Sequence, residues 1–215
     1  MGELFLDKVV AFITRAGAQG AELLLFEHPY AGIQLPAGTV EAGEPLAHAV
    51  LREAWEETGL TGLELRRSIG AQTVTLPDHR FTLGRAQVYA RPDAASFGWA
   101  ELPRGVVVRC LRQEGDFEQI RYREWDRQPN SRYVTYEITG WAPRALLTDG
   151  LHRHFFHLSH HGQTPAQWTV ATDSHRFRLF WARLDALPAL EPLQAGWLGY
   201  VQKELGYDLA ADVHR

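Results

Sequence analysis

The sequence predicts an α/β fold elaborated by a β-rich insertion, in a single domain that spans residues 1–215. Three observations predict it. Two apolar runs rich in β-branched residues, 8–15 and 21–28, are typical of strands. One segment, 44–58, has the flanking residues of a helix. A long stretch, 105–161, alternates strand-like runs with turn residues, and it is the expected insertion.

The first two runs, KVVAFITR and AELLLFEH, predict a β-hairpin. The residues between them, Gly17 to Gly20, are turn-forming. Pro29, Gly32 and Pro36 then interrupt regular structure around a short strand, GIQLP.

The segment Glu44–Thr58 predicts the clearest helix of the chain. Pro45 suits the first helical position, where the missing N–H of proline costs nothing. Gly59 suits the residue just past the end, where a left-handed backbone conformation is needed. Five apolar residues share one arc of this helix and are expected to face the core: Ala47, Val50, Leu51, Ala54 and Trp55.

The remaining elements are mostly strands. A strand is expected at about 63–70, followed by two hairpin-like arms, TVTLPDHR and RFTLGRAQVYA. The expected insertion, 105–161, contains four runs: GVVVRCL, FEQIRYREW, RYVTYEITGW and HRHFFHLS. WTVAT and RFRLFWARL predict two further strands, and 194–205 predicts an amphipathic helix.

Composition is that of a soluble globular protein, with 45% hydrophobic and 22% charged residues. No apolar run approaches the roughly twenty residues that a membrane span needs, so no membrane partner is expected. The N-terminal segment carries Glu3 and Asp7 and lacks the cationic lead of a signal peptide, so a cytoplasmic location is expected. A single cysteine, Cys110, excludes an intrachain disulfide and a multi-cysteine zinc site.

The charge balance argues against a dedicated nucleic-acid binder, because the net charge is -4. Lys8 and Lys203 are the only lysines, and every other basic residue is arginine. Arginine suits planar contacts to phosphate, but codon usage in a GC-rich genome also favours it. The imbalance therefore carries no functional weight by itself.

Residues 38–60 read GTVEAGEPLAHAVLREAWEETGL. This segment resembles the Nudix box, G-x5-E-x7-R-E-U-x-E-E-x-G-U, in which U is a bulky aliphatic residue. Eight positions match: Gly38, Glu44, Arg52, Glu53, Glu56, Glu57, Gly59 and Leu60. The soft position is Ala54, which is aliphatic but small. Fixed residues at fixed spacing make this motif far more specific than a lone glycine pattern.

The spacing of the three glutamates has its own physical reading. Glu53, Glu56 and Glu57 project within an arc of roughly 100° on a helix with 3.6 residues per turn. Like charges on adjacent turns repel, so a sequence selected only for stability would rarely gather them. Hard divalent cations, which prefer oxygen ligands, relieve this repulsion. A solvated acidic face is the alternative for the glutamates taken alone.

The resemblance implies a Nudix-type α/β/α sandwich with a mixed β-sheet, and a site that holds Mg²⁺ or Mn²⁺. It implies Glu53, Glu56 and Glu57 as metal ligands, with the carbonyl of Ala37 as a backbone ligand. Glu53, Glu57 and Arg52 are the implied catalytic set, in which Arg52 orients a carboxylate. Gly38, Glu44 and Gly59 are implied to be structural.

The residue that takes the proton of the attacking water differs among members of this family. Glu53 or Glu57 is the choice here. Five carboxylates outside the motif stay open as alternatives: Glu101, Glu114, Asp116, Glu118 and Glu124.

Features outside the motif bear on the substrate. Pro77 lies near the place where ADP-ribose hydrolases of this family tend to carry a proline, but it is also a plain turn residue. Five histidines between His152 and His161 lack a carboxylate or cysteine at ligand spacing, which favours strand and loop roles over a metal site. Arg123, Trp125 and Tyr136 are the candidate substrate-binding residues, as side chains suited to a phosphate and a base.

The resulting hypothesis is a metal-dependent pyrophosphohydrolase that cleaves a nucleoside diphosphate linked to another moiety, such as ADP-ribose-like or dinucleotide compounds. One alternative is a nucleoside triphosphate pyrophosphohydrolase of the sanitising type. Another is a non-catalytic Nudix-fold module that binds a nucleotide. A small nucleotide-type diphosphate is the expected partner, and a homodimer stays open.

Overall fold

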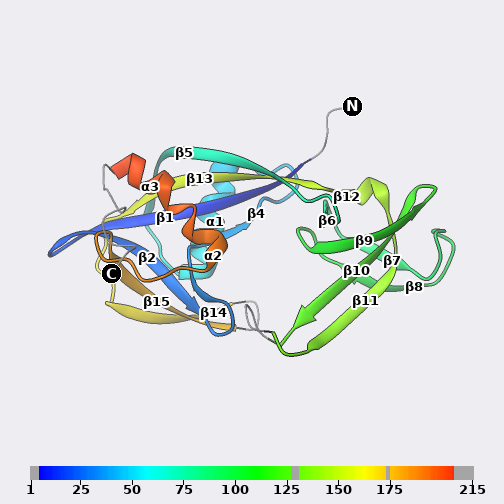
Figure 1. Cartoon of the computed structure of the whole chain (residues 1–215). Helices are drawn as coiled ribbons and strands as arrows, with labels where there is room; N and C mark the ends of the chain where they lie inside the picture. The colour runs from blue at the N-terminus through cyan, green and yellow to red at the C-terminus, as the bar shows by residue number, and fades with distance from the viewer. Residues whose placement is uncertain (1–4, 127–130, 173–174, 206–215) are drawn as a thin grey trace. The chain divides into compact units, whose positions relative to one another are not determined.

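The computed structural model describes residues 5–126, 131–172 and 175–205 (Figure 1). The chain divides into two compact units. Unit 1 comprises residues 1–8 and 72–153, and unit 2 comprises residues 9–71 and 154–215. In the described ranges, no helix is both long enough and apolar enough to span a membrane.

An eight-stranded sheet forms the centre of unit 2, and three of its strands (β1, β5 and β13) also include residues assigned to unit 1. Its main path runs β14-β15-β2-β1-β13-β5, while β3 pairs with β2 and β4 with β1. The strands are β1 (Leu6–Gly17), β2 (Gly20–His28), β3 (Gly32–Gln34), β4 (Ala37–Thr39), β5 (Leu63–Thr75), β13 (Gly150–His160), β14 (Gln167–Thr172) and β15 (His175–Arg183). The predicted hairpin is confirmed, because β1 and β2 pair antiparallel up to Gly17 and Gly20.

Two apolar clusters cover the two faces of this sheet. Alternate residues of β1 point to opposite faces, as the geometry of a strand requires. Val9 and Ile13 pack with helix α1 (Leu46–Thr58), whereas Val10 and Phe12 pack with helix α3 (Leu198–Leu205) and the residues before it. The sheet is therefore covered on both faces, in agreement with the expected α/β/α sandwich. Each fully buried large side chain here contributes about 1.5–3 kcal/mol.

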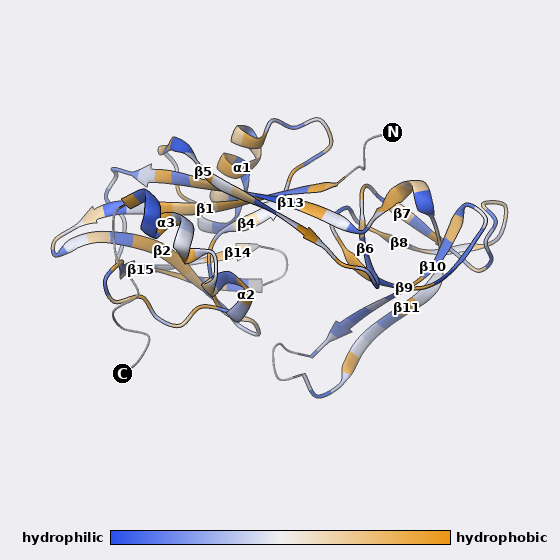
Figure 2. Cartoon of the chain, turned by 45° about the horizontal axis from the view of Figure 1, so that its top comes forward, coloured by the Kyte–Doolittle hydropathy of each residue, from blue (hydrophilic) through white to orange (hydrophobic). Residues whose placement is uncertain are grey.

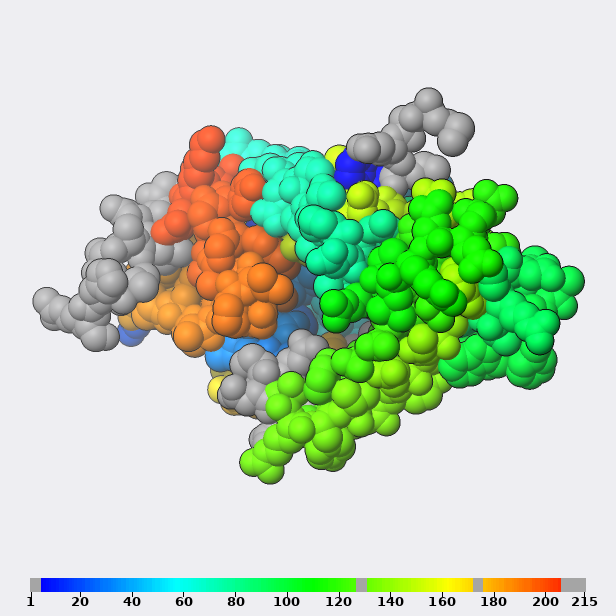
Figure 3. Space-filling model, turned by 45° about the vertical axis from the view of Figure 1, so that its right-hand side comes forward, coloured from blue at the N-terminus to red at the C-terminus, as the bar shows by residue number. Residues whose placement is uncertain are grey.

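The predicted C-terminal helix is two short helices, α2 (Pro192–Ala195) and α3, separated at Gly196. Gln194 of α2 ties this end of the chain to the sheet, because its Oε1 accepts the Leu35 N–H at 2.6 Å. Figure 3 shows α2 and α3, in orange and red, directly beside the turquoise residues of β5. In Figure 2, apolar residues (orange) recur along β1 and β2, whose consecutive buried residues fit a sheet that is covered on both faces.

Helix α1 starts at Leu46, two residues later than predicted. Pro45 is its N-cap residue, with an extended backbone, and not its first helical residue. The predicted end is confirmed: Gly59 is left-handed, with a φ of 69°, and its N–H reaches the Trp55 carbonyl at 2.7 Å.

The buried face of α1 differs from the predicted arc. Ala49, Val50 and Ala54 are buried, but Trp55, predicted to face the core, is 56% exposed. The helix is rotated toward its glutamate side, because that side packs on β4 through contacts of Glu53 and Glu57. Hydrophobicity alone did not reveal that carboxylates would take part in this packing.

Unit 1 contains a seven-stranded sheet in the order β12-β6-β9-β10-β11-β7-β8. Its strands are β6 (His79–Thr82), β7 (Ala86–Tyr89), β8 (Gly98–Leu102), β9 (Val107–Glu114), β10 (Phe117–Trp125), β11 (Val134–Pro143) and β12 (Leu147–Thr148), and a short 3-10 helix, η1 (Arg144–Leu146), precedes β12. One face carries its own core, centred on Val88, Val108, Ile120 and Ile138.

The predicted insertion, 105–161, does not coincide with one sheet. β9 to β12 lie in the unit 1 sheet together with β6 to β8, which precede the predicted segment. β13, which contains the histidine-rich run, pairs in the other sheet. Strand-like runs of similar composition do not show which partners they will pair with, so this assignment was not available from sequence. The insertion itself stays a prediction.

Candidate functional site

The glutamate face of α1 lies against the short strand β4 in unit 2. Pro36, just before β4, is tied to β1, because its carbonyl accepts the Ala11 N–H at 2.8 Å. Ala37 in turn donates its N–H to Glu57 Oε2 at 2.8 Å. A carboxylate of the helix is thus bound to the backbone of the residue predicted as a carbonyl ligand.

Gly38 is required by the position of Glu53. A Cβ at residue 38 would lie 1.8 Å from Glu53 Cδ and 2.0 and 2.2 Å from its two carboxylate oxygens. Only glycine leaves room for that carboxylate. The Glu53 side chain is 15% exposed, and this burial raises its pKa above the ordinary value.

Arg52 connects the residues of the motif. Its Nε and Nη2 donate to the two oxygens of Glu44 at 2.9 and 2.8 Å, which is a bidentate pair. Nη2 also donates to the Thr39 carbonyl at 3.1 Å. Hydrogen bonding to Arg52 lowers the pKa of Glu44 to about 2 and raises that of Arg52. Glu44 also accepts the Glu41 N–H at 3.0 Å, which fixes the loop before the helix.

The remaining nitrogen of Arg52 contacts the helix carboxylates. Nη1 donates to Glu53 Oε1 at 2.9 Å and to Glu56 Oε2 at 3.0 Å. Glu56 is the most open of these groups, with its side chain 42% exposed. One arginine thus holds two carboxylates of the predicted metal set in defined positions, while Glu57 is held by Ala37.

The residues fit a hard divalent cation by their chemistry. Glu53, Glu56 and Glu57 supply carboxylate oxygens within two turns of one helix, and Arg52 is the positively charged side chain that contacts Glu53 and Glu56. Over residues 5–126, 131–172 and 175–205, no three His, Cys, Asp or Glu side chains are already gathered as a metal cluster. Their carboxylates are turned to Arg52 and to Ala37 instead, so side-chain rotation on one helix face is needed to bring them together.

The predicted substrate-binding residues lie in unit 1, whereas the motif lies in unit 2. Arg123 and Trp125 alternate with Glu124 along β10, and Glu124 stands opposite Tyr136 on β11. Directly opposed residues share a face, so Tyr136 projects from the face opposite to that of Arg123 and Trp125. The structure does not gather these three side chains on one face.

The five carboxylates outside the motif also lie in unit 1. Glu118 is buried and pairs with Arg80 at 3.0 Å. Glu101 pairs with Arg85 at 2.6 Å, and Glu124 accepts the Tyr122 hydroxyl at 2.7 Å. These three carboxylates have structural partners, whereas Glu114 and Asp116 are exposed near the β9–β10 turn.

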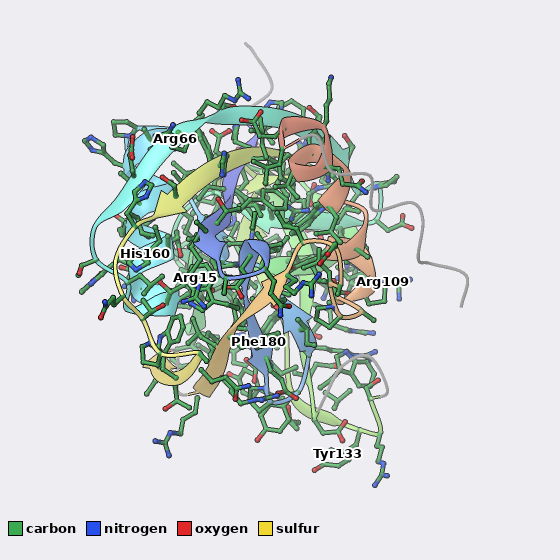
Figure 4. The ribbon with its side chains drawn as sticks, turned by 90° about the vertical axis from the view of Figure 1, so that its left-hand side faces the viewer. Arg15, Arg66, Arg109, Tyr133, His160 and Phe180 are labelled. Carbon is green, nitrogen blue, oxygen red and sulfur yellow. The ribbon has the colours of Figure 1, made fainter. Side chains whose placement is uncertain are left out.

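The histidine run is accounted for by ordinary strand contacts. His157 contacts Thr14 Oγ1 at 2.8 Å, and His152 contacts Thr73 Oγ1 at 3.0 Å. His161 lies 3.3 Å from Glu64. His160 is buried, and its ring nitrogens have no hydrogen-bond partner in the described part of the chain. It lies on β13 next to β1, which carries Arg15 (Figure 4).

Two contributors to the site were missed at the sequence level. The Thr39 carbonyl accepts from Arg52, and Trp168 of β14 donates its indole N–H to the Thr58 carbonyl at 2.8 Å. The second contact satisfies a carbonyl at the end of α1 that has no partner within the helix. A backbone carbonyl and a tryptophan 110 residues away give no sequence signal for these roles.

A family model described as the NUDIX domain matches residues 5–127. No curated protein sequence matches the chain.

Solved structures with a similar fold include the Ap4A hydrolase of C. elegans, at 12% identity and a TM-score of 0.45, covering 95% of this chain and 98% of that chain. The MutT protein of Methanosarcina mazei Go1 aligns at 15% identity and a TM-score of 0.44, covering 95% and 98%. The NUDIX domain of Shewanella oneidensis NrtR, solved with ADP ribose, aligns at 13% identity and a TM-score of 0.43, covering 94% and 90%.

Proposed function

The chain belongs to the Nudix family, a family of hydrolases that act on pyrophosphate bonds, and we propose that it cleaves the diphosphate of a nucleoside diphosphate linked to another moiety. ADP-ribose-like and dinucleotide compounds are the proposed substrates. The observation that carries the proposal is the intact motif, in which Arg52, Gly38 and Ala37 hold the three helix glutamates in place.

Family members generally need a divalent metal, and we assign its ligands in this chain to Glu53, Glu56, Glu57 and the Ala37 carbonyl. Mg²⁺ or Mn²⁺ bound there would polarise the phosphoryl oxygens and lower the pKa of the attacking water. Arg52 orients Glu53 and Glu56 by its two hydrogen bonds from Nη1. Gly38 leaves the space that the Glu53 carboxylate occupies.

The proton of the attacking water is proposed to pass to Glu53 or Glu57. The competing carboxylates of unit 1 are not supported by a comparable arrangement: three of them hold structural contacts.

The predicted insertion, 105–161, is proposed as the source of substrate discrimination, and its strands β9 to β12 lie in the unit 1 sheet. The motif offers charge and metal, which any diphosphate satisfies equally, so selectivity must come from groups that contact the ends of the substrate. Arg123 and Trp125 share one face of β10 and are tested together by alanine replacement. Tyr136→Ala, on the other face, is the matched control. If the Arg123→Ala/Trp125→Ala variant ranks the substrates by turnover in the same order as the wild type, these two residues do not discriminate between substrates.

The proposed reaction is tested with a nucleotide panel in the presence of Mg²⁺. ADP-ribose and dinucleoside polyphosphates resist phosphatase until they are cleaved, so phosphate released after phosphatase treatment reports turnover. Nucleoside triphosphates are scored separately, by pyrophosphate with inorganic pyrophosphatase. We expect turnover of the linked diphosphates. Pyrophosphate release from triphosphates alone would favour the sanitising activity, and no turnover across the panel would favour a nucleotide-binding module.

A further inference from the structure

One face of the unit 1 sheet carries a surplus of arginine. Antiparallel register places Arg112 of β9 opposite Gln119 of β10, and Arg109 opposite Arg121. Arg123 follows two residues later on β10, on the same face. We call these four residues the arginine band: Arg109, Arg112, Arg121 and Arg123. Trp125 continues the band on β10 and is 40% exposed.

The acidic groups near the band do not neutralise it. Glu137 of β11 lies 2.5 Å from Arg123 and 3.7 Å from Arg121, so one carboxylate serves two guanidinium groups. Arg112 donates to Gln119 at 3.0 Å and lies over the Trp141 ring at 4.9 Å, which leaves its charge uncompensated. Arg109 has no hydrogen-bond or ion-pair partner within the described ranges. Glu114, two residues after Arg112 on β9, lies on the same face, so four positive charges share this face with two carboxylates, in a chain with a net charge of -4.

The pairing of Arg109 with Arg121 is unfavourable for folding. Like charges directly opposite each other in an antiparallel sheet are destabilising. In addition, Arg121 Nε is buried and has no hydrogen-bond partner among the residues that the structure describes. Both features cost stability, and an anion placed over this pair would relieve the repulsion between the two guanidinium groups.

The extent of the band indicates what kind of anion fits. From the level of Gln119 to Trp125, β10 advances six residues, which is about 20 Å along the strand. A single phosphate group contacts only one level of such a band, whereas a chain of phosphates follows all of it. The exposed indole at one end adds a surface on which a base can stack. Arginine contacts phosphate in a bidentate geometry and also stacks on bases.

We propose that the arginine band is a binding surface for single-stranded nucleic acid, and it shares Arg123 and Trp125 with the residues proposed above for substrate discrimination. Phosphates contact Arg109, Arg112, Arg121 and Arg123, and Trp125 stacks on a base. Binding is independent of sequence, because phosphate contacts carry no base information. It needs no divalent metal, since the charges that attract the strand belong to the protein. The proposal thus does not depend on the proposed function.

The test is fluorescence anisotropy with a 5′-fluorescein-labelled oligouridylate that lacks a 5′-phosphate, in EDTA, with the full chain. The variant Arg109→Ala/Arg121→Ala is compared with Arg85→Ala/Arg91→Ala, which removes the same charge from exposed positions of unit 1. We expect the band variant to bind at least about tenfold more weakly, and the control to bind as the wild type does. The slope of log K against log salt should fall by about 0.7 for each lost phosphate contact.

Trp125→Ala separates nucleic acid from a plain polyanion. It should weaken binding of the oligonucleotide at least about fivefold without changing the salt slope. It should not change competition by inorganic polyphosphate, which has no bases. The proposal is overturned if the wild type does not bind at low salt, if both double variants bind equally well, or if Trp125→Ala has no effect. Melting temperatures of all variants exclude unfolding, and removal of Arg109 should not lower them.

Discussion

Gly38→Ala is a sharp probe of the site, because it adds one methyl group at the place where the Glu53 carboxylate lies. The new Cβ would stand 1.8 Å from Glu53 Cδ, far inside van der Waals contact. The backbone at residue 38 is not left-handed, so alanine brings no conformational strain of its own. The substitution therefore acts through Glu53.

The two consequences of this clash differ in size. The end of a glutamate side chain is flexible and can rotate away, so the free energy of unfolding should change by less than about 1 kcal/mol. The displaced carboxylate can no longer serve at the site. Losing an electrostatic group of this kind typically costs on the order of 10²–10³ in rate. We expect a stable protein with a kcat lowered on the order of 10².

The assay is a double-mutant cycle in kcat, on the best substrate of the nucleotide panel, at saturating Mg²⁺. Its members are the wild type, Gly38→Ala, Glu53→Ala and the double variant. Glu53→Ala removes the atoms that the new methyl group would meet, so Gly38→Ala should cause almost no further loss in that background. Mn²⁺ binding by calorimetry gives a second readout that needs no turnover.

Two outcomes would refute this reasoning. A Gly38→Ala protein with near-normal kcat would mean that Glu53 is not needed where the structure places it. Equal losses from Gly38→Ala with and without Glu53 would mean that the glycine acts through the backbone. Urea unfolding of each variant checks that the fold survives.

Three further predictions concern stability. Mg²⁺ at about 100 times its Kd should raise the free energy of unfolding by about 2.7 kcal/mol, and a melting temperature unchanged by millimolar Mg²⁺ would count against the site. Arg52→Lys keeps the positive charge but loses the two-pronged guanidinium contact with Glu44, so the free energy of unfolding measured in urea should fall by about 1–2 kcal/mol. Arg85→Lys, in an exposed ion pair, is the control. A loss for Arg52→Lys no larger than that for the control would contradict this prediction. Burial lowers the pKa of His157 and of His160, so both take up protons on unfolding. The histidines should therefore cost no stability above about pH 6.5, and the free energy of unfolding should fall as the pH drops below that value. The fall should be up to about 1.4 kcal/mol per pH unit for each histidine. A His157→Asn variant whose free energy of unfolding has the wild-type dependence on pH would contradict this.

The part of the fold that the sequence made predictable is local. The hairpin at the N-terminus and the end of α1 followed from turn and cap chemistry, in which Gly59 supplies the left-handed residue. The pairing of strands that lie far apart in the chain could not be predicted, because it depends on contacts between residues that no short segment of sequence contains. β13 therefore pairs in the eight-stranded sheet, although its sequence resembles that of the strands in the seven-stranded sheet.

For the candidate site, residue types at fixed spacing predicted which side chains would take part, and that stays a prediction; the structure adds how these side chains contact one another. The fork from Arg52 to Glu44 and the space at Gly38 depend on the path of β4, which the sequence does not encode locally. Trp55 shows the limit of periodicity: an apolar residue was expected in the core, but carboxylates anchored to β4 turned the helix and left it exposed.

The central claim is that the α1 glutamates hold the metal that drives diphosphate hydrolysis, and Glu57→Gln tests it most directly. The amide oxygen of glutamine can still accept the Ala37 N–H, so the fold should persist while a charged ligand is lost. Glu64→Gln, at an exposed position of β5, makes the same chemical change away from the site. At saturating Mg²⁺, kcat should fall on the order of 10²–10³ for Glu57→Gln and stay unchanged for Glu64→Gln. Near-normal kcat in a folded Glu57→Gln protein would contradict the claim.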